Sequence, residues 1–319
     1  MQIKTNIAKV MEETGDKIKY DNEVKKVLSD PQILAWILKY SVREFEEYSI
    51  RKIMECIDGK PEVAVHPVHP EHFTAPLEGM PTEETEISAR KVTYDIRFRV
   101  TVPGEGTVGM IINVEAQNKF HESYDLVSRG VFYCARMLST QVRNEELVKE
   151  YNNLKKVYSI WICLQVPLNS EYTITGYRMK QENIYGCMQS KVNMRYDLME
   201  LVIVCLGRTE NANKGTELHK LLTTVLSEKL SPEKKIEVMK NEYNIVTTVE
   251  MEGGLAKMCN LSDYIEEKGI QRGIEQGIFR TLFTLVQKSR LTLEEAAQEA
   301  GRSVNEFEIL YNQFVKENT

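Results

Sequence analysis

Two carboxylates lie inside neighbouring stretches that read as strands. The stretches "VTYDIRFRV" (92–100) and "GMIINVEAQNK" (109–119) both alternate apolar and polar residues, and Asp95 and Glu115 each occupy a polar position. Side chains alternate between the two faces of a strand, so this pattern predicts two β-strands with an acid on one face of each. Carboxylate oxygens are hard ligands that suit Mg²⁺ or Mn²⁺.

The segment between the two stretches, "TVPGEGTV", has the composition of a turn. A hairpin that is symmetric about Glu105 pairs Ile96 with Val114 and sets Asp95 directly opposite Glu115. Opposed side chains in an antiparallel pair have Cβ atoms about 4.5–5.5 Å apart. Two carboxylates at that distance repel each other unless a cation lies between them or one is protonated.

Another interpretation of Asp95 stays open. Asp95 can instead pair with Arg97 or Arg99 on a solvated sheet face. The run "HPVHPEHF" (66–73) places three histidines three residues apart, but it is broken by proline and predicts a loop, so we interpret these histidines as incidental to metal binding.

Composition bounds the class of protein. A chain of 319 residues with 42 % hydrophobic residues can bury a large core in one or two domains. A net charge of −6 argues against a generally basic nucleic-acid coat protein and leaves room for a local basic groove. No apolar run is long enough to span a membrane, and the six scattered cysteines form no CxxC pair, so we expect a reduced, cytoplasmic protein.

The order of the predicted elements is that of an α/β protein. Asp30 and Pro31 are typical of a helix start, and helices are predicted up to residue 57. Residues 58–90 are predicted to form a long surface loop. The hairpin is followed by a predicted helix over 122–142, strands over 155–166, 172–179 and 199–207, and two further helical stretches.

The last part of the chain has a different character. Gly269, Gly273 and Gly277 recur every four residues, which aligns them along one side of a helix and permits close approach of a partner helix. The final segment has helix–glycine–helix form with cap-like Thr292 and Ser303. It resembles half of a helix-turn-helix, although such pairs are also common packing units. We predict an N-terminal segment over 1–19, a main domain over 20–245 and a helical tail over 246–319.

A strand with a central Asp, a turn, a strand with Glu-x-Gln and then a helix resembles the core of the PD-(D/E)XK nuclease superfamily. "YDIRF" and "IINVEAQNKFHESYDLVSRGVFYCARML" are similar in particular to the PD-(D/E)XK nuclease family transposases. The resemblance implies a restriction-endonuclease-like α/β fold, with a mixed central sheet flanked by helices and a C-terminal helical tail. It also implies metal-dependent cleavage of phosphodiester bonds in DNA.

The resemblance assigns roles to the hairpin residues. It implies that Asp95 and Glu115 hold Mg²⁺ or Mn²⁺, which lowers the pKa of a bound water. Gln117 stands where the superfamily usually has lysine. Glutamine can orient a water but carries no charge to stabilise an oxyanion. Lys119, two residues further along the same strand face, is a candidate for the missing cation.

The flanking helices supply further candidates. Related nucleases often complete the site with an acid from the first helix, for which Glu44 and Glu47 are candidates. Arg129, Tyr133 and Arg136 share one face of the predicted helix after the hairpin and are candidates for binding DNA phosphate. The structural alternative for Arg129 is a salt bridge to Asp125.

We therefore predict a metal-dependent DNA endonuclease that acts in recombination or mobile-element biology. The alternative is a non-catalytic DNA-binding or assembly protein that keeps the nuclease fold, and the glutamine at position 117 favours it. The glycine-lined helix predicts a homodimer through the C-terminal tail, because two symmetry-related sites commonly cut both DNA strands. Docking of the tail on the chain's own main domain is the competing explanation.

Overall fold

The structure is a computed structural model that describes residues 18–64, 83–84, 92–103, 108–119, 125–142, 151–186, 195–208 and 214–317. The chain forms two compact units, Met1–Leu261 and Ser262–Thr319. The first unit contains the sheet and the predicted acids. The domain bounds predicted from the sequence remain a prediction.

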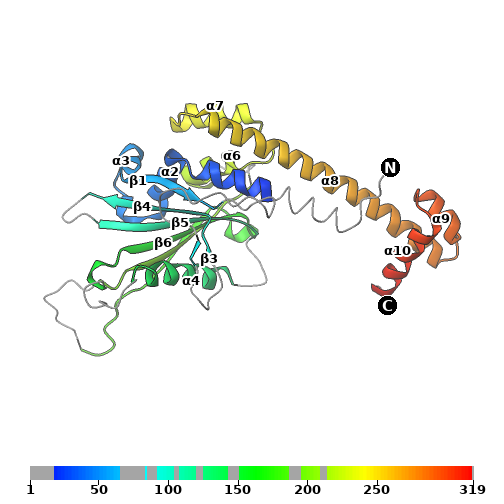
Figure 1. Ribbon diagram of the computed structural model, residues 1–319, viewed down its shortest axis with the longest axis horizontal. Helices are drawn as coiled ribbons and strands as arrows, with labels where there is room; N and C mark the ends of the chain where they lie inside the picture. The colour runs from blue at the N-terminus through cyan, green and yellow to red at the C-terminus, as the bar shows by residue number, and fades with distance from the viewer. Residues whose placement is uncertain are drawn as a thin grey trace. The chain divides into compact units, whose positions relative to one another are not determined.

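A six-stranded mixed sheet forms the centre of the first unit (Figure 1). Strand β4 pairs antiparallel with its neighbours β1 and β5, β6 pairs parallel with β5 and β8, and β7 closes the sheet antiparallel to β8. The strands in spatial order are β1 (Ile57–Val63), β4 (Ile96–Val102), β5 (Val108–Lys119), β6 (Lys156–Gln165), β8 (Met199–Cys205) and β7 (Thr173–Arg178). The predicted fold class, a mixed sheet flanked by helices, is confirmed.

The β4–β5 hairpin has the predicted register. Ile96 lies opposite Val114 and Phe98 opposite Ile112, as symmetry about Glu105 requires. The ladder ends at Ile96, so Asp95 is the next residue out and faces the Glu115 end of β5. Alternation along the two strands, in a register symmetric about Glu105, therefore determines which acids meet.

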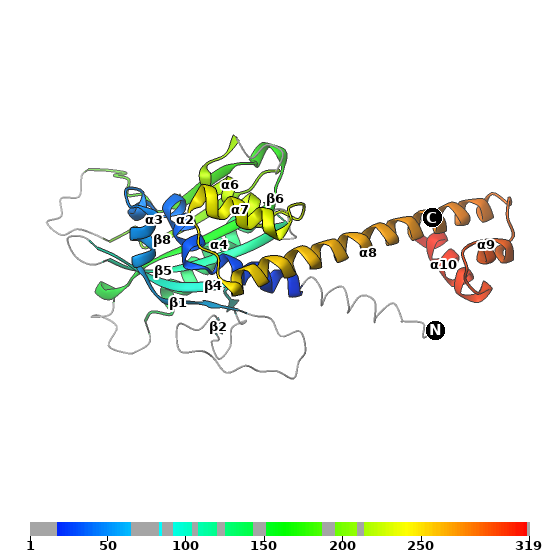
Figure 2. The same cartoon turned by 90° about the horizontal axis from the view of Figure 1, so that it is seen from above.

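Helices cover both faces of the sheet (Figures 1 and 2). A helix over residues 18–28 packs with α2 (Pro31–Ser41), α6 (Glu217–Val225) and α7 (Pro232–Tyr243) on one face. Helix α4 (Leu126–Ser139) packs against β6 and β8 on the other face. Helix α2 begins as predicted, because Asp30 accepts a hydrogen bond from the Gln32 backbone and Pro31 occupies the first turn. Both sheet faces are thus buried, and polar residues on β5 lie in the interior.

The remaining short elements lie around this core: η1 (Arg43–Phe45), α3 (Ile50–Glu55), η2 (Tyr151–Asn153), η3 (Leu168–Ser170) and a two-stranded sheet of β2 (Glu83–Glu84) and β3 (Val92–Thr93). Within the described residues, no helix combines the length and apolar character needed to cross a membrane.

The prediction of a loop from residue 58 onward is wrong for its first residues. Strand β1 pairs with β4 at the edge of the sheet, with an irregular register between Asp58 and Glu62. Gly59 has φ +70°, a backbone conformation that glycine adopts readily. Glycine and Pro61 hide the strand pattern in the sequence, and both are tolerated at an irregular edge strand.

The second unit ends in two helices with their own small core. Helix α8 covers Val249–Gln287, α9 covers Leu293–Glu299 and α10 covers Val304–Glu317. Thr292 caps α9 in a reciprocal capping box, and Ser303 and Glu306 form matching bonds at the start of α10. Apolar side chains from all three helices pack together, including Phe283, Ala296 and Phe307. The predicted helix–glycine–helix ending is confirmed, with Gly301 between α9 and α10 at φ +62°.

Candidate active site

Asp95 and Glu115 lie side by side where the β4–β5 ladder ends. The backbone N–H of Asp95 donates to Oε1 of Glu115 at 3.0 Å, and the backbone N–H of Ala116 donates to Oδ2 of Asp95 at 3.1 Å. Each carboxylate is therefore held by the backbone of the opposite strand. Glu115 is buried, and the side chain of Asp95 is 14 % exposed. The structure thus brings the two predicted acids together in a nearly dry position.

The acid pair carries more negative charge than its surroundings readily stabilise. Burial raises the pKa of Glu115 well above its usual range, and repulsion by the Asp95 carboxylate adds to the rise. Burial also raises the pKa of Asp95, although the nearby ammonium of Lys25 opposes the rise. Such a pair favours a bound cation or a shared proton.

The cation that contacts Asp95 comes from the helix over residues 18–28. Nζ of Lys25 lies 2.8 Å from Oδ1 of Asp95 and 2.7 Å from Oδ2 of Asp21, and Lys25 is 1 % exposed. Burial lowers the pKa of this ammonium, but the two carboxylates more than offset that effect and the pKa of Lys25 is raised. Lys25 therefore stays charged at neutral pH.

The two arginines proposed as alternative partners of Asp95 differ in burial. Arg97 is buried and its guanidinium lies 4.9 Å from the ring centroid of Tyr94. Arg99 is exposed. The solvated-face interpretation of Asp95 is wrong, because its side chain is only 14 % exposed and Lys25, from the helix over residues 18–28, supplies the positive charge.

Helix α4 brings Arg129 and Tyr133 close to the acid pair. Arg129 donates to the Tyr133 hydroxyl at 2.9 Å, and its guanidinium lies 5.1 Å from the ring centroid of Trp161, the register partner of Glu115. The charge of Arg129 partly counteracts the rise in the pKa of Glu115. Asp125 caps α4 by accepting from Ser128, so it has a role other than the suggested salt bridge to Arg129.

Arg136 is placed differently from the other two α4 residues. It is buried, and it lies about 10 Å further along the helix axis than Arg129. Tyr133 is also mainly a core residue, because its ring packs against Tyr94 and Trp161 at centroid distances of 5.3 Å. Of the three predicted phosphate-binding residues, the structure places only the hydroxyl of Tyr133 and the guanidinium of Arg129 near the acids.

The remaining predicted residues are distributed over the sheet. Gln117 follows Glu115 on β5 and is partly buried, and the backbone of Lys119 pairs with Gln165, while the Lys119 side chain lies outside the described residues. Glu44 bonds to Lys156 and Tyr158 instead of approaching Asp95, and Glu47 is exposed. The histidines at 66, 69 and 72 also lie outside the described residues.

The sequence analysis missed Asp21 and Lys25, although a signal for them exists. Asp21, Lys25 and Leu28 follow at spacings of four and three, so they share one helix face, and Leu28 is fully buried. Two charged residues on an apolar helix face predict a buried ion pair or a site. The helix over residues 18–28, which precedes α2 in the chain, contributes the acid Asp21 near the pair. Lys25 bridges Asp21 to Asp95.

A mixed sheet with an Asp and a Glu-x-Gln at the end of its central hairpin, crossed by a following helix, defines the core of a PD-(D/E)XK nuclease. The family model of the PD-(D/E)XK nuclease family transposases matches residues 87–260, more than half of the chain. The chain belongs to this family. Comparison with curated proteins and with solved structures gave no match.

PD-(D/E)XK nucleases typically use divalent metals, and the residues present fit such an ion. In the described part of the chain, no three Asp, Glu, His or Cys side chains gather as a metal-binding group. Mg²⁺ is commonly bound by one or two carboxylates, with waters and substrate phosphate completing its shell. The buried pair of Asp95 and Glu115 supplies two carboxylates for such a donor set.

Proposed function

We propose that the protein is a divalent-metal-dependent DNA endonuclease that hydrolyses phosphodiester bonds in recombination or mobile-element biology. The observation that supports this most strongly is the pairing of two buried carboxylates, Asp95 and Glu115, at the end of the hairpin. Membership of a nuclease family gives the reaction class, and the acid pair gives the position.

Asp95 and Glu115 bind the cation, Mg²⁺ or Mn²⁺, in this proposal. A bound divalent ion polarises a phosphate and lowers the pKa of water. The side-chain amide of Gln117 orients the attacking water through hydrogen bonds. Arg129 and the hydroxyl of Tyr133 contact the DNA phosphate on the α4 side, where arginine suits the geometry of phosphate oxygens. Arg136 is also proposed as a DNA contact, and the support for this is its position on the same helix.

The positive charge that Gln117 lacks is supplied by Lys25. Its ammonium is buried, charged and already in contact with Asp95, so it stabilises negative charge that develops next to the acid pair. Lys119 remains the second candidate for this charge because it follows Gln117 on the same strand. The two candidates differ in a testable way, since replacing the lysine that acts should lower cleavage while leaving cation binding in place.

Nicking of supercoiled plasmid tests the proposal. We expect wild-type protein to nick the plasmid with Mg²⁺ or Mn²⁺ and not in EDTA, and we expect Asp95→Ala to reduce nicking to background. Asp58→Ala is the control, because Asp58 is an exposed acid on β1 that accepts a hydrogen bond from Thr101 and lies outside the acid pair. Absence of metal-dependent nicking under all conditions, or equal nicking by Asp95→Ala, contradicts the proposal.

The rival function is a non-catalytic DNA-binding or assembly protein with a nuclease fold. Two observations favour it: Gln117 replaces the usual lysine, and Lys25 neutralises Asp95 without a metal. The rival predicts DNA binding that survives both EDTA and Asp95→Ala, with no strand cleavage.

We further propose that two copies associate through the C-terminal tail. Ile274 is 59 % and Ile278 48 % exposed on α8, and a side chain added at Gly277 would meet open space. These residues line an apolar hollow of about 360 Å³ on that helix. We also propose that the protein acts in the cytoplasm, where thiols stay reduced. The supporting observation is that the described cysteines are free and buried.

A further inference from the structure

A cavity of about 560 Å³ lies beside β7, apart from the acid pair. Its rim includes Arg43, Tyr177, Arg178, Lys180, Tyr196 and Asp197. This volume is in the range of small-ligand sites, about 300–1,000 Å³. We call this feature the β7 pocket.

The β7 pocket lies at the other end of the sheet from Asp95 and Glu115. Glu115 pairs with Trp161 and Trp161 with Ile203, whereas the pocket lies near Glu200, three residues earlier on β8 and opposite Arg178. The two places are therefore separated by about 10 Å along the strands and about 10 Å across them. The pocket residues are not part of the acid pair's surroundings.

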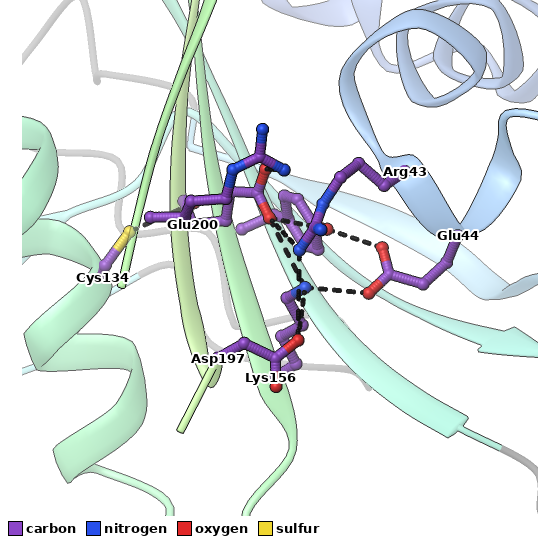
Figure 3. Close-up of polar contacts among 8 residues, drawn as sticks. Arg43, Glu44, Cys134, Lys156, Asp197 and Glu200 are labelled. Atoms are coloured by element: carbon purple, nitrogen blue, oxygen red, sulfur yellow. Dashed lines mark hydrogen bonds and ion pairs between the residues drawn. The ribbon is translucent and has the colours of Figure 1, made fainter. Parts of the chain in front are cut away.

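The lining residues Arg43, Arg178 and Asp197 contact a buried network of charged residues centred on Glu200 (Figure 3), and we call this network the floor of the pocket. Oε2 of Glu200 lies 3.1 Å from the hydroxyl oxygen of Tyr158, accepts from Arg43 at 3.2 Å and lies 3.4 Å from Nζ of Lys156. Glu44 accepts from Lys156 at 2.9 Å and from Tyr158 at 2.6 Å. Because Glu200 is 3 % exposed and has several donors, it is a fixed anchor for the groups above it.

Two arginines are held over this floor with their outer sides in solvent. Arg43 bonds to Glu200, and Nη1 of Arg178 lies 3.9 Å from Oε1 of the same carboxylate. Their side chains are 48 % and 46 % exposed. Each guanidinium has five N–H groups, so those that do not face Glu200 can bind a phosphate. Anchoring from below reduces the conformational entropy lost on binding.

The open side of the pocket is cationic although the chain as a whole is acidic. Within the described residues that form it, Arg43, Arg178 and Lys180 surround a single rim carboxylate, Asp197. Glu44 and Glu200 lie beneath and are neutralised in part by Lys156. On a chain of net charge −6, this local excess of positive charge favours an anionic ligand.

One tyrosine indicates what kind of anion fits. Tyr196 is 47 % exposed, which is high for a large aromatic side chain next to a pocket. The side chain of Tyr177 lies on the other face of β7 from Arg178, because Tyr177 pairs with Leu201 of the α4-side core. Exposed aromatic rings beside arginines are the arrangement on which bases of single-stranded nucleic acid stack. Bases in a duplex are already stacked and are less available to such rings.

We propose that the β7 pocket binds single-stranded DNA, with phosphate on Arg43, Arg178 and Lys180 and a base on Tyr196. This inference deepens the proposed function, since it assigns the pocket to an unpaired flank of the DNA on which the nuclease acts. Binding at the pocket does not require the metal, and that separates the two claims experimentally.

Fluorescence anisotropy in EDTA tests the proposal with full-length protein and a fluorescein-labelled oligothymidine of about 12 nucleotides, within the site size of single-strand-binding domains. The test variant is Tyr196→Ala with Lys180→Ala, since both side chains are exposed and line the pocket. We expect this variant to bind at least about tenfold more weakly, as loss of one stacked base and one phosphate contact implies. A duplex of equal length should be affected much less.

The matched control is Tyr151→Ala with Lys240→Ala, an exposed tyrosine and an exposed lysine outside the pocket. Thermal melting verifies that both variants are folded. Equal affinity of wild type and test variant, equal loss in test and control, or no binding of the oligonucleotide by wild type overturns the inference. If the test variant binds the oligonucleotide more weakly as expected but wild type never nicks the plasmid, the pocket proposal holds and the endonuclease proposal fails. If wild type nicks the plasmid but the test variant binds the oligonucleotide as wild type does, the endonuclease proposal holds and the pocket proposal fails.

Discussion

At the scale of single residues, the acid pair depends on the buried ammonium of Lys25. Replacing it by methionine keeps the length of the side chain and removes the charge that contacts Asp95 and Asp21. Removing one partner of a buried ion pair costs about 3–5 kcal/mol, because the other charge is left buried. We expect Lys25→Met to lower the free energy of unfolding by that order in the absence of metal, measured by urea denaturation.

The neighbouring Lys26→Met is the control for this prediction. Lys26 pairs with Glu23 at the surface with its side chain 43 % exposed, and such pairs contribute less than about 1 kcal/mol. Mn²⁺ should restore more stability to Lys25→Met than to wild type, because a divalent ion replaces the missing positive charge. Equal stability of the two variants without metal would show that Lys25 does not compensate the acids.

At the scale of elements, the close packing of α4 on the sheet depends on Gly130. A Cβ atom built there would lie 2.4 Å from Cδ1 of Leu201, which is 2 % exposed and enclosed in the core. We expect Gly130→Ala to destabilise the protein by about 1–3 kcal/mol, the usual cost of overpacking. On α8, Gly253 has nothing within 4 Å, so Gly253→Ala should instead stabilise by about 0.4–1 kcal/mol. Thermal denaturation of both variants measures the contrast, and a stabilising Gly130→Ala would refute the close approach.

The start of α6 gives the first unit a pH-sensitive cap. The Thr216 backbone N–H donates to Nδ1 of His219 at 3.0 Å, so Nδ1 carries no proton, and His219 is 1 % exposed. Burial lowers the pKa of His219. A lowered folded-state pKa means that the unfolded chain takes up the proton first, so stability is present above about pH 6.5 and is lost as pH falls through the folded-state pKa.

His219→Gln tests this cap, because glutamine at the same position can accept from the Thr216 backbone but does not titrate. Between pH 7 and pH 5, chosen around the histidine pKa of about 6.5, wild type should lose stability relative to the glutamine variant. Urea denaturation at several pH values gives the difference directly. If the stability difference between wild type and His219→Gln does not change with pH, protonation of His219 does not contribute to the pH dependence.

The sequence predicted the elements whose patterns are local. Alternation and a compact turn gave the strands and register of the hairpin, and Asp30–Pro31 and Thr292 marked helix starts. Strand β1 was missed, because Gly59 and Pro61 interrupt its pattern and its pairing with β4 comes from a distant segment.

The candidate site was predictable only where it depends on one hairpin. Asp95 and Glu115 meet through local pairing, whereas Lys25 reaches Asp95 from a helix 70 positions earlier in the chain. Glu44 was a reasonable candidate by its place before the hairpin, yet Lys156 and Tyr158 hold it in the other network. Which helix packs near which strand end is a tertiary property that spacing along one segment does not encode.

At the scale of the whole molecule, the tail prediction concerns assembly. Each of Gly269, Gly273 and Gly277 costs about 0.8–1.0 kcal/mol relative to alanine within a helix, and α8 nevertheless continues through all three. In the proposed dimer, packing of a second copy on the exposed Ile274 and Ile278 would offset that cost. We expect light scattering to show a dimer at micromolar concentration for the full chain and a monomer for a chain truncated after Asn260.

A full-length variant separates loss of the tail from loss of its apolar face. Ile274→Asp with Ile278→Asp should give a monomer, whereas Val304→Asp, an exposed apolar position on α10, should leave the dimer intact. A monomeric wild-type chain would rule out the dimer and favour docking of the tail within the chain.

We propose that Asp95 and Glu115 together bind one divalent cation, and calorimetric titration of the metal-free protein with Mn²⁺ measures this binding. We expect one binding event that Asp95→Asn and Glu115→Gln each weaken by about tenfold or more, since even loss of an outer-shell partner costs metal sites that much. Asp58→Asn should bind like wild type. Mn²⁺ binding that is absent from wild type, or unchanged in Asp95→Asn and Glu115→Gln, would contradict the account.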